Sequence, residues 1–392
     1  MLTEYSNSRD DFKPGVLMLL SNPATYDTRP VKEALSLANN GYKVILLAWD
    51  REGGAPKHSF ISKNLVIQRF KLRAPYGQNM RTLLGFALFY IWCFINSVMK
   101  HFQVIHCHDV DTLLCGILLK IPRWSRVKLV YDMHDHPVMF LSKFPKSEIL
   151  INLIFTFTRS YFDHLVVVNE GFVKYLSRRG FKKGNLTVIM NVPETVVGRP
   201  QLRENGVFRI FYYGSLSRVR GVHNLINAVS PLSNVLLLLA GKGELVSLIT
   251  KLERTHTNIS YLGWLSPSEL DSFIRASNLI LSLSSLYSPN NINHILATPE
   301  KFFTSLAHGI PVLVSEGTYQ ATLARRYGCG LIVDMKNISD IREVIEILVK
   351  DKELYNRLAR NGLKIARERF NWKIMEKRLV SLYESLNRRT IS

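Results

Sequence analysis

The sequence lacks the features by which several classes of protein are recognised. It has four cysteines among 392 residues and no CxxC pair or zinc-finger spacing, so we expect reduced, buried thiols. It has no long run of lysine or arginine and no aromatic RNA-binding signature, which argues against nucleic acid as a partner. Residues 1–14 contain no apolar signal core, so we expect a cytoplasmic protein.

Acidic residues are scarce relative to basic ones. The chain contains 51 lysines and arginines against 31 aspartates and glutamates, a formal net charge of +20. A charge of this size favours polyanionic partners. The basic residues are spread along the chain, which fits phosphate-bearing small molecules and a membrane surface at least as well as nucleic acid.

One long apolar run interrupts this charge. Residues 82–99 contain no charged side chain and lie between Arg81 and Lys100, a length that approaches the roughly 20 residues of a membrane span. The run leads directly into an expected strand, and a spanning helix would put two halves of one sheet on opposite sides of the bilayer. We therefore favour a helix that packs on the first domain or dips into the bilayer, with simple burial and a true span as alternatives.

Short apolar runs alternate with helical stretches along the whole chain. This alternation is typical of α/β domains with parallel sheets covered on both faces. The length exceeds one hydrophobic core, so we expect two doubly wound domains, residues 1–195 and 206–370, separated by the polar segment 193–206. The expected strands are residues 16–20, 43–48, 65–69, 104–106, 128–131, 165–168, 187–190, 208–213, 235–240, 259–262, 279–283, 311–314 and 330–333, and the expected helices include 30–39, 222–229, 266–276, 299–308 and 340–350.

Two glycine-bearing turns follow expected strands of the second domain. Gly214 and Ser215 come after the first strand, and Arg218 and Arg220 precede the next helix. The free N–H groups of such a helix start suit a phosphate, and arginines add charge-assisted contacts. A βα turn with surface arginines is the plain alternative. The turn at Gly241 lacks the third glycine of a dinucleotide fingerprint and is by itself more typical of a tight turn.

The expected helix 299–308 has clear boundary signals. Thr298 suits its cap, Pro299 its first turn, and Gly309 its end. Glu300 is favourable near the positive end of the helix. Capping alone explains much of this pattern.

Two loops rich in histidine and aspartate follow neighbouring strands of the first domain, at residues 106–112 and 131–137. Ligands of open parallel sheets bind at the carboxyl ends of the strands, so we expect both loops at one edge. Polar substrate contacts or proton handling are favoured, since histidine titrates near neutral pH. A metal site is the alternative, because His106, His108, His134 and His136 have alternating spacing.

Taken in order, these segments resemble a glycosyltransferase family 4 protein of the GT-B fold. The resemblance rests on DTRPVKEA (27–34), GYKV (41–44), VIHCHDVDTL (104–113), LVYDMHD (129–135), HLVVVNEGF (164–172), GSLSRVRG (214–221), LLAGKGE (238–244), TPEKFFTSLAHGIPVLVS (298–315) and the closing helix that follows FNW (370–372).

The resemblance implies two Rossmann-like domains that face a central cleft, with a closing helix, residues 371–392, that crosses back to the first domain. It implies transfer of a sugar from a nucleotide diphosphate sugar, usually with retention, and with neither a bound metal nor another cofactor. On this basis we expect His134 and Asp109 to be catalytic and His108 and Asp135 to lie on the acceptor side. The expected donor-binding residues are Gly214, Ser215, Arg218, Arg220, Gly241, Glu300, Lys301 and Thr304.

The sequence departs from the family pattern at several positions. The two family glutamates, spaced eight apart, fall at Leu296 and Thr304, neither of which is acidic, and Glu300 is out of register by one helical turn. Ser215 stands where the pattern has an arginine, and the glycine-rich loop of the first domain is absent.

The expected function is a hexosyltransferase that builds a polysaccharide or glycolipid. The positive charge and the apolar run suggest a lipid-linked acceptor and peripheral contact with the inner face of the cell membrane. The missing glutamates motivate an alternative, a non-catalytic GT-B scaffold or partner subunit that binds nucleotide sugar. A sugar-nucleotide epimerase or a phosphorylase on the same fold is a third possibility.

Overall fold

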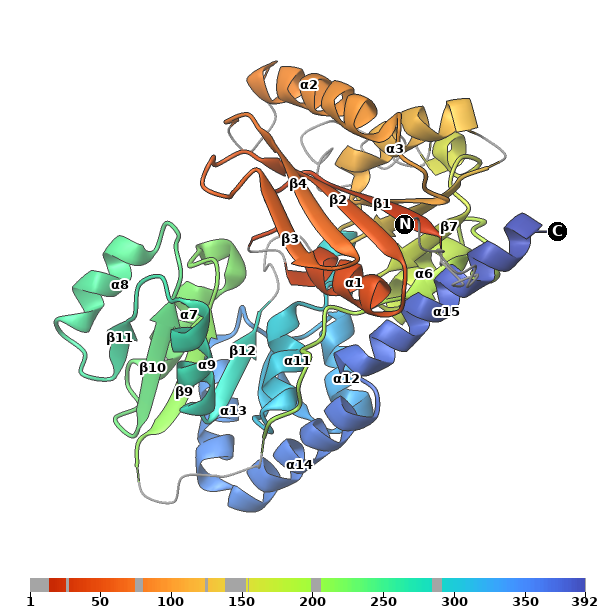
Figure 1. Cartoon of the computed structure of the whole chain (residues 1–392). Coiled ribbons are helices and arrows are strands. Elements are labelled where there is room, and N and C mark those ends of the chain that lie inside the picture. The colour runs from red at the N-terminus through yellow and green to blue at the C-terminus, as the bar shows by residue number, and fades with distance from the viewer. Residues whose placement is uncertain are drawn as a thin grey trace, which may run out of the picture. The chain divides into compact units, whose positions relative to one another are not determined.

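The computed structural model describes residues 14–25, 28–74, 80–123, 126–137, 153, 155–198, 206–283 and 291–391, with the side chains of 388–391 left out. The chain divides into two compact units (Figure 1). The first comprises Met1–Ile189 together with Met375–Ser392, and the second comprises Met190–Ile374. Residues 199–205 of the expected boundary segment and residues 26 and 27 of the family-like opening lie outside the described residues.

The first unit contains an eight-stranded sheet in the order β3-β4-β2-β1-β5-β6-β7-β8. Its paired strands are parallel except for β3 and β4, which are antiparallel. The strands are β1 (Gly15–Leu20), β2 (Lys43–Asp50), β3 (His58–Ser62), β4 (Leu65–Lys71), β5 (Val104–His108), β6 (Lys128–Met133), β7 (His164–Val167) and β8 (Leu186–Val188). The helices are α1 (Thr28–Asn39), α2 (Met80–Ser97), α3 (Val110–Lys120), α6 (Glu170–Ser177) and α15 (Trp372–Ile391), with 3₁₀ turns η1 (Ile121–Arg123) and η2 (Lys183–Asn185).

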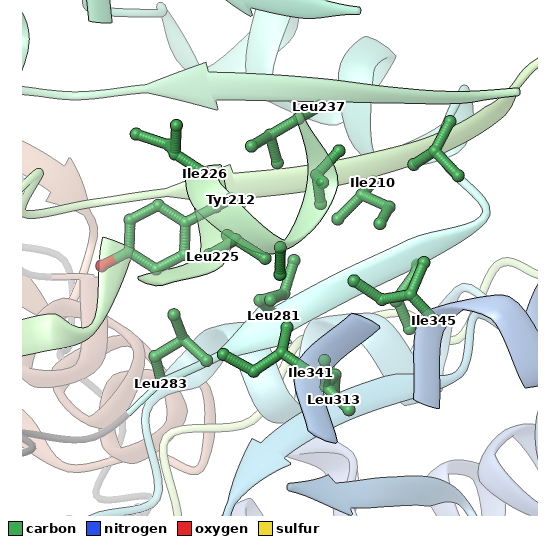
Figure 2. Packing of buried hydrophobic residues seen from close by; sticks show 14 of the residues in the cluster. Ile210, Tyr212, Leu225, Ile226, Leu237, Leu281, Leu283, Leu313, Ile341 and Ile345 are labelled. Carbon is green, nitrogen blue, oxygen red and sulfur yellow. The ribbon is translucent and has the colours of Figure 1, made fainter. Parts of the chain in front are cut away.

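The second unit contains a six-stranded parallel sheet in the order β11-β10-β9-β12-β13-β14. Figure 2 shows its core, in which side chains of β9, β12 and helix α7 pack together. The strands are β9 (Phe208–Tyr213), β10 (Val235–Ala240), β11 (Ile259–Tyr261), β12 (Leu279–Ser282), β13 (Val312–Ser315) and β14 (Gly330–Val333). The helices are α7 (Val222–Val229), α8 (Val246–Glu253), α9 (Pro267–Arg275), α10 (Ile292–Leu296), α11 (Glu300–Ala307), α12 (Tyr319–Tyr327), α13 (Ile338–Lys350) and α14 (Lys352–Glu368), with the 3₁₀ turn η3 (Arg218–Arg220).

Two local predictions were wrong for identifiable reasons. The strand β3 was missed because it is an exposed edge strand without an apolar run, and Phe60 at its centre is 80% exposed. Thr298 was expected to cap α11, but the N-cap is Pro299, which makes no side-chain capping bond. All four cysteines are free and buried, as expected.

Helix α2 corresponds to the long apolar run and packs on the sheet by one face. A Cβ on Gly85 would lie 2.5 Å from Cη2 of Trp49, so only glycine allows this approach. The rings of Phe86 and Phe89 lie 5.1 and 5.6 Å from the Trp49 ring. The helix is long and apolar enough to cross a membrane, yet only 28% of it is buried. Simple burial therefore does not explain its composition, because its opposite face exposes Leu83, Leu84, Leu88, Ile91, Phe94 and Ile95.

Candidate active site

The turn after β9 is held against the turn after β10 by backbone contacts. The Gly214 N–H donates to the Ala240 carbonyl at 2.9 Å, and the Leu216 N–H donates to the Lys242 carbonyl at 2.9 Å. Gly241 has φ 130°, and a Cβ there would lie 1.9 Å from the Gly214 carbonyl oxygen. The glycine that looked weak as a motif is therefore required for the two turns to meet.

The ammonium of Lys301 lies beneath the first of these turns. Its Nζ donates to the Tyr213 carbonyl at 2.6 Å and lies 4.9 and 5.1 Å from the rings of Tyr212 and Tyr213. A Cβ on Gly214 would lie 2.9 Å from this nitrogen, so a side chain at this position would crowd the ammonium. Burial, reinforced by the charge of Arg220, lowers the pKa of Lys301 to about 8.

The two predicted arginines occupy the 3₁₀ turn η3 just before α7. Gly221 then adopts a left-handed conformation with φ 76°, and no side chain caps the first turn of α7. Arg218 is exposed, and its backbone N–H donates to Glu244 at 2.8 Å. Arg220 is half-buried and near enough to affect Lys301 electrostatically. The region therefore combines cations with the positive end of a helix.

The remaining donor-side predictions gather around the Tyr213 side chain, which the sequence had not singled out. Its hydroxyl shares a hydrogen bond with Thr304, and burial together with the charge of Glu300 raises the pKa of Tyr213. The hydroxyl of Thr304 thus has a partner within this unit. Ser215 is exposed, and its carbonyl accepts a hydrogen bond from the Tyr212 hydroxyl at 2.9 Å.

In the first unit, the two histidine-bearing loops meet at one sheet edge. Strands β5 and β6 are parallel neighbours, with His108 opposite Asp132. Asp109 Oδ1 accepts the backbone N–H groups of His134 at 3.0 Å and Asp135 at 3.2 Å. Asp109 itself has φ 62°, a strained conformation for a residue with a Cβ. The paired loops predicted from the sequence are therefore assembled.

Asp109 is the less charged of the two important aspartates. Burial raises the pKa of Asp109 to about 7, although the nearby charge of His134 acts to lower it. Its side chain is 28% exposed and lies 3.8 Å from Nδ1 of His134, measured from Oδ2. This carboxyl can therefore exchange a proton near neutral pH.

Asp132 is the centre of the buried charge network. One oxygen pairs with the Arg29 guanidinium, and the other lies 2.9 Å from Nε2 of His134 and 3.2 Å from Nδ1 of His108. Burial opposes ionisation of Asp132, but Arg29 and His134 outweigh it and hold its pKa well below the usual range. Arg29 also bonds Glu33 at 2.9 Å, so α1 supplies two of the network's charges.

His134 is held as a cation by this network. Burial lowers its pKa, but the Asp132 carboxylate outweighs burial and raises the pKa of His134 to about 10. An imidazole that is protonated at neutral pH is a poor general base there, whereas it can donate a hydrogen bond or stabilise negative charge. Its side chain is 16% exposed, so it remains accessible to a ligand.

His108 occupies a different place from the one expected. It is 1% exposed, and burial, which disfavours the charged ring, lowers the pKa of His108 to about 3. It therefore lies as a neutral ring against His134, with Nδ1 at 3.2 Å from Nε2, instead of contacting an acceptor. Asp135 remains partly exposed at the edge of the site.

Of the four histidines proposed for a metal site, His106, His108 and His134 lie together, but His136 does not join them. His136 packs among the rings of Phe155, Phe172 and Tyr175. Another four side chains, Glu33, His106, His108 and Asp132, place one ligand atom each within 4.8 Å of one another. Arg29 already pairs with both carboxylates, so we interpret this group as an ion-pair network.

Sequence reasoning missed the buried charged side chains that surround the histidines of this site. Arg29 and Glu33 lie in the DTRPVKEA segment, and Asp132 lies in LVYDMHD, yet none was expected to interact with the histidines. A signal was available, since a helix that buries Arg and Glu four residues apart needs charged partners.

Comparison with known proteins gives matches along most of the chain. The model of the Glycosyltransferase Family 4 matches residues 33–192, and that of Glycosyl transferases group 1 matches residues 199–365. No curated protein sequence matches this chain.

Solved structures similar in fold include several transferases. Sucrose-phosphate synthase from Thermosynechococcus elongatus has a TM-score of 0.75 at 16% identity, covering 96% of this chain and 100% of its own. HepE from Anabaena, in complex with UDP and glucose, has a TM-score of 0.69 at 16% identity, and the match covers 95% of this chain and 100% of HepE. The catalytic domain of starch synthase IV from Arabidopsis thaliana, bound to ADP and acarbose, has a TM-score of 0.67 at 12% identity. That match covers 97% of this chain and 99% of the starch synthase domain. These likenesses identify the fold as GT-B.

Proposed function

Because this chain is a glycosyltransferase whose first half matches the model of Glycosyltransferase Family 4 and whose second half matches that of Glycosyl transferases group 1, we propose that it transfers a hexosyl group from a nucleotide diphosphate sugar. Transfer proceeds with retention to a polysaccharide or lipid-linked glycan acceptor. The reaction takes place in the cytoplasm, at the inner face of the cell membrane.

The single observation that carries this proposal is the cationic turn of the second unit. Lys301 lies half-buried beneath Gly214, and Arg220 precedes a helix whose N-cap residue, Gly221, has no side chain to cap it. A diphosphate supplies negative charge to match these cations. As the sugar leaves, these cations stabilise the charge that develops on the diphosphate. UDP in the HepE structure supports this choice of ligand class.

The histidine site of the first unit supplies the complementary chemistry. Protonated His134 donates a hydrogen bond to the transferred sugar, and Asp132 keeps it protonated. Asp109, with its pKa near neutrality, accepts a proton from the acceptor hydroxyl. Asp135 lies beside Asp109 and contacts the acceptor. His108 orients His134 through the contact between their ring nitrogens.

The exposed apolar face of α2 supports membrane contact. Leu84 and Ile91 lie on this face, and the neighbouring helix α3 exposes Leu114 and Leu118. Figure 1 shows helices α2 and α3 of the first unit. An apolar groove of about 210 Å³ lies between the two helices. A second copy of the chain would bring two charges of +20 together, whereas an anionic leaflet attracts them.

Vesicle co-sedimentation tests this membrane contact. Replacing both Leu84 and Ile91 by Gln should abolish binding to anionic vesicles, because it removes apolar side chains on the face that lies against the bilayer. The control is Phe60→Gln, which changes an even more exposed apolar side chain on the edge strand β3. Equal loss in both proteins would refute the assignment of α2 as the docking helix.

A non-catalytic scaffold that binds nucleotide sugar is the second candidate. Leu296 and Thr304 stand where the family pattern has glutamates, and the Thr304 hydroxyl is bonded to Tyr213. An assay with labelled nucleotide sugars and a panel of lipid-linked acceptors distinguishes the two. Binding without turnover for every acceptor favours the scaffold, and altered nucleotide sugar released without acceptor indicates an epimerase.

A thermal-shift screen tests the donor site directly. UDP, ADP and GDP and their sugars are titrated against the natural chain and Arg220→Ala. The expected result is stabilisation of the natural chain by at least one nucleotide, at about 2.7 kcal/mol for ligand at a hundred times Kd, and its loss in Arg220→Ala. Arg275→Ala, which removes an exposed arginine paired with Asp271, is the matched control. Equal shifts in all three proteins exclude Arg220 from the site.

A further inference from the structure

Helix α15 contributes one buried side chain to the histidine network. Tyr383 is fully buried, and its hydroxyl oxygen lies 2.7 Å from Nδ1 of His106. The ring of Tyr42 packs edge-on against the Tyr383 ring at 5.5 Å, which fixes its orientation. The contact joins residues 277 apart in sequence, so helix α15 reaches strand β5 inside the sheet of the first unit.

The surroundings of the two ring nitrogens of His106 favour one tautomer over the other. Nε2 lies 3.6 Å from Oε2 of Glu33 and 3.7 Å from Oδ2 of Asp132. Two carboxylates on this side favour an N–H at Nε2. The other nitrogen, Nδ1, then accepts the proton of the Tyr383 hydroxyl.

His106 competes with His134 for the same carboxylate. The His106 ring stacks on the His108 ring, with centroids 4.5 Å apart and planes at 18°. The Asp132 oxygen that bonds His134 at 2.9 Å is the one that faces His106. A second positive charge on His106 would therefore weaken the attraction between Asp132 and His134.

We propose that Tyr383 is a positioning residue, which holds His106 with its proton on Nε2 and so reserves the Asp132 charge for His134. The role of His134 in transfer rests on the proposed function, whereas the proton arrangement does not. The charged or titratable groups that face His134 or act on it are Asp132 on β6, His108 on β5, Asp109 and Asp111 after β5, and Arg29 and Glu33 on α1.

Histidine NMR on the full-length, labelled chain tests the proposal without any substrate. In the natural chain, the ¹⁵N shifts of His106 should report a protonated Nε2 and an unprotonated Nδ1. In Tyr383→Phe, Nδ1 loses this donor, so the ¹⁵N shifts of His106 should move toward a mixture of the two tautomers, and the pKa of His134 should change because Asp132 then faces a different ring atom of His106. Tyr355→Phe removes a hydroxyl of equal burial that bonds the Asn278 carbonyl in the second unit, and it should leave His134 unchanged.

A double-mutant cycle separates positioning from general loosening. If the hydroxyl acts through His106, Tyr383→Phe should have no further effect on His134 in a His106→Asn background. An unchanged His134 in Tyr383→Phe, an equal shift in the His106→Asn background, or the opposite tautomer in the natural chain would each overturn the proposal. If the histidines titrate as expected but the natural chain shows no transferase activity, the result counts against the proposed function alone.

Discussion

The candidate sites of the two units are built in opposite ways. In the second unit, the turns after β9 and β10 are shaped by backbone, and glycines at 214 and 241 decide how closely they approach. In the first unit, side-chain charges decide the site, and Arg29 and Asp132, 103 residues apart, form its central ion pair. Steric defects should therefore damage the second unit, and charge defects the first.

The largest expected effect comes from breaking the charge network of the first unit. Asp132→Asn leaves Arg29 without its main partner in a buried site, which should lower the free energy of unfolding by about 3–5 kcal/mol. The pKa of His134 should return from about 10 toward its ordinary value, since Asp132 is what raises it. Urea unfolding and histidine NMR measure the two changes.

The same variant has a signed pH dependence. A histidine whose pKa is raised by folding stabilises the native state below its unfolded pKa, and this stability is lost as the pH rises through the folded value. The stability gap between the natural chain and Asp132→Asn should therefore narrow between about pH 7 and pH 10. Asp271→Asn, which breaks an exposed pair with Arg275, should cost less than about 1 kcal/mol, and a comparable loss there would contradict the comparison.

A steric change in the second unit should have the next largest effect. Gly241→Ala forces a Cβ to within 1.9 Å of the Gly214 carbonyl and demands φ 130° of a residue with a side chain. The free energy of unfolding should fall by about 2–3 kcal/mol, and nucleotide stabilisation should disappear with the turn. Urea unfolding with and without UDP measures both.

A second glycine provides the control for this steric argument. Gly263 also has a positive φ, 70°, but a Cβ there would meet no atom within 4 Å. Gly263→Ala should therefore cost only its backbone strain, about 1 kcal/mol, and should leave nucleotide stabilisation intact. Equal damage by both substitutions would show that backbone conformation, and not the contact between the two turns, governs the region.

The contrast also explains how far the sequence could be read. Helix α7 and the strands of the second unit follow from contiguous apolar runs and glycines, so local patterns predict them. The paired loops after β5 and β6 follow from the rule that parallel strands end at one edge, and the parallel pairing confirms that expectation. The edge strand β3 carries too few buried residues to leave such a pattern.

Long-range partners could not be read in the same way. The bond between Tyr383 and His106 and the pairing of Arg29 with Asp132 depend on strand order and side-chain direction. The burial of His108 has the same origin, because the rings of His106 and His134 and the Asp132 carboxylate lie against it. Local spacing showed that histidines gather, but it did not show which of them is charged.

The smallest expected effect tests Lys301, whose ammonium supports the turn of the second unit. Burial lowers the pKa of Lys301 to about 8, so its charge is present at pH 7 and is lost as the pH rises through that value. The affinity for UDP should therefore fall by roughly tenfold between pH 7 and pH 9, because the diphosphate loses a cationic partner.

In Lys301→Met the affinity for UDP should be lower at pH 7 and should hardly change between pH 7 and pH 9. Isothermal titration calorimetry measures both profiles, and Lys350→Met, on the exposed surface of α13, should keep the natural slope. Parallel slopes in the natural chain and Lys301→Met would mean that the turn recognises its ligand through backbone and arginine alone, which would make the contrast between the two units sharper still.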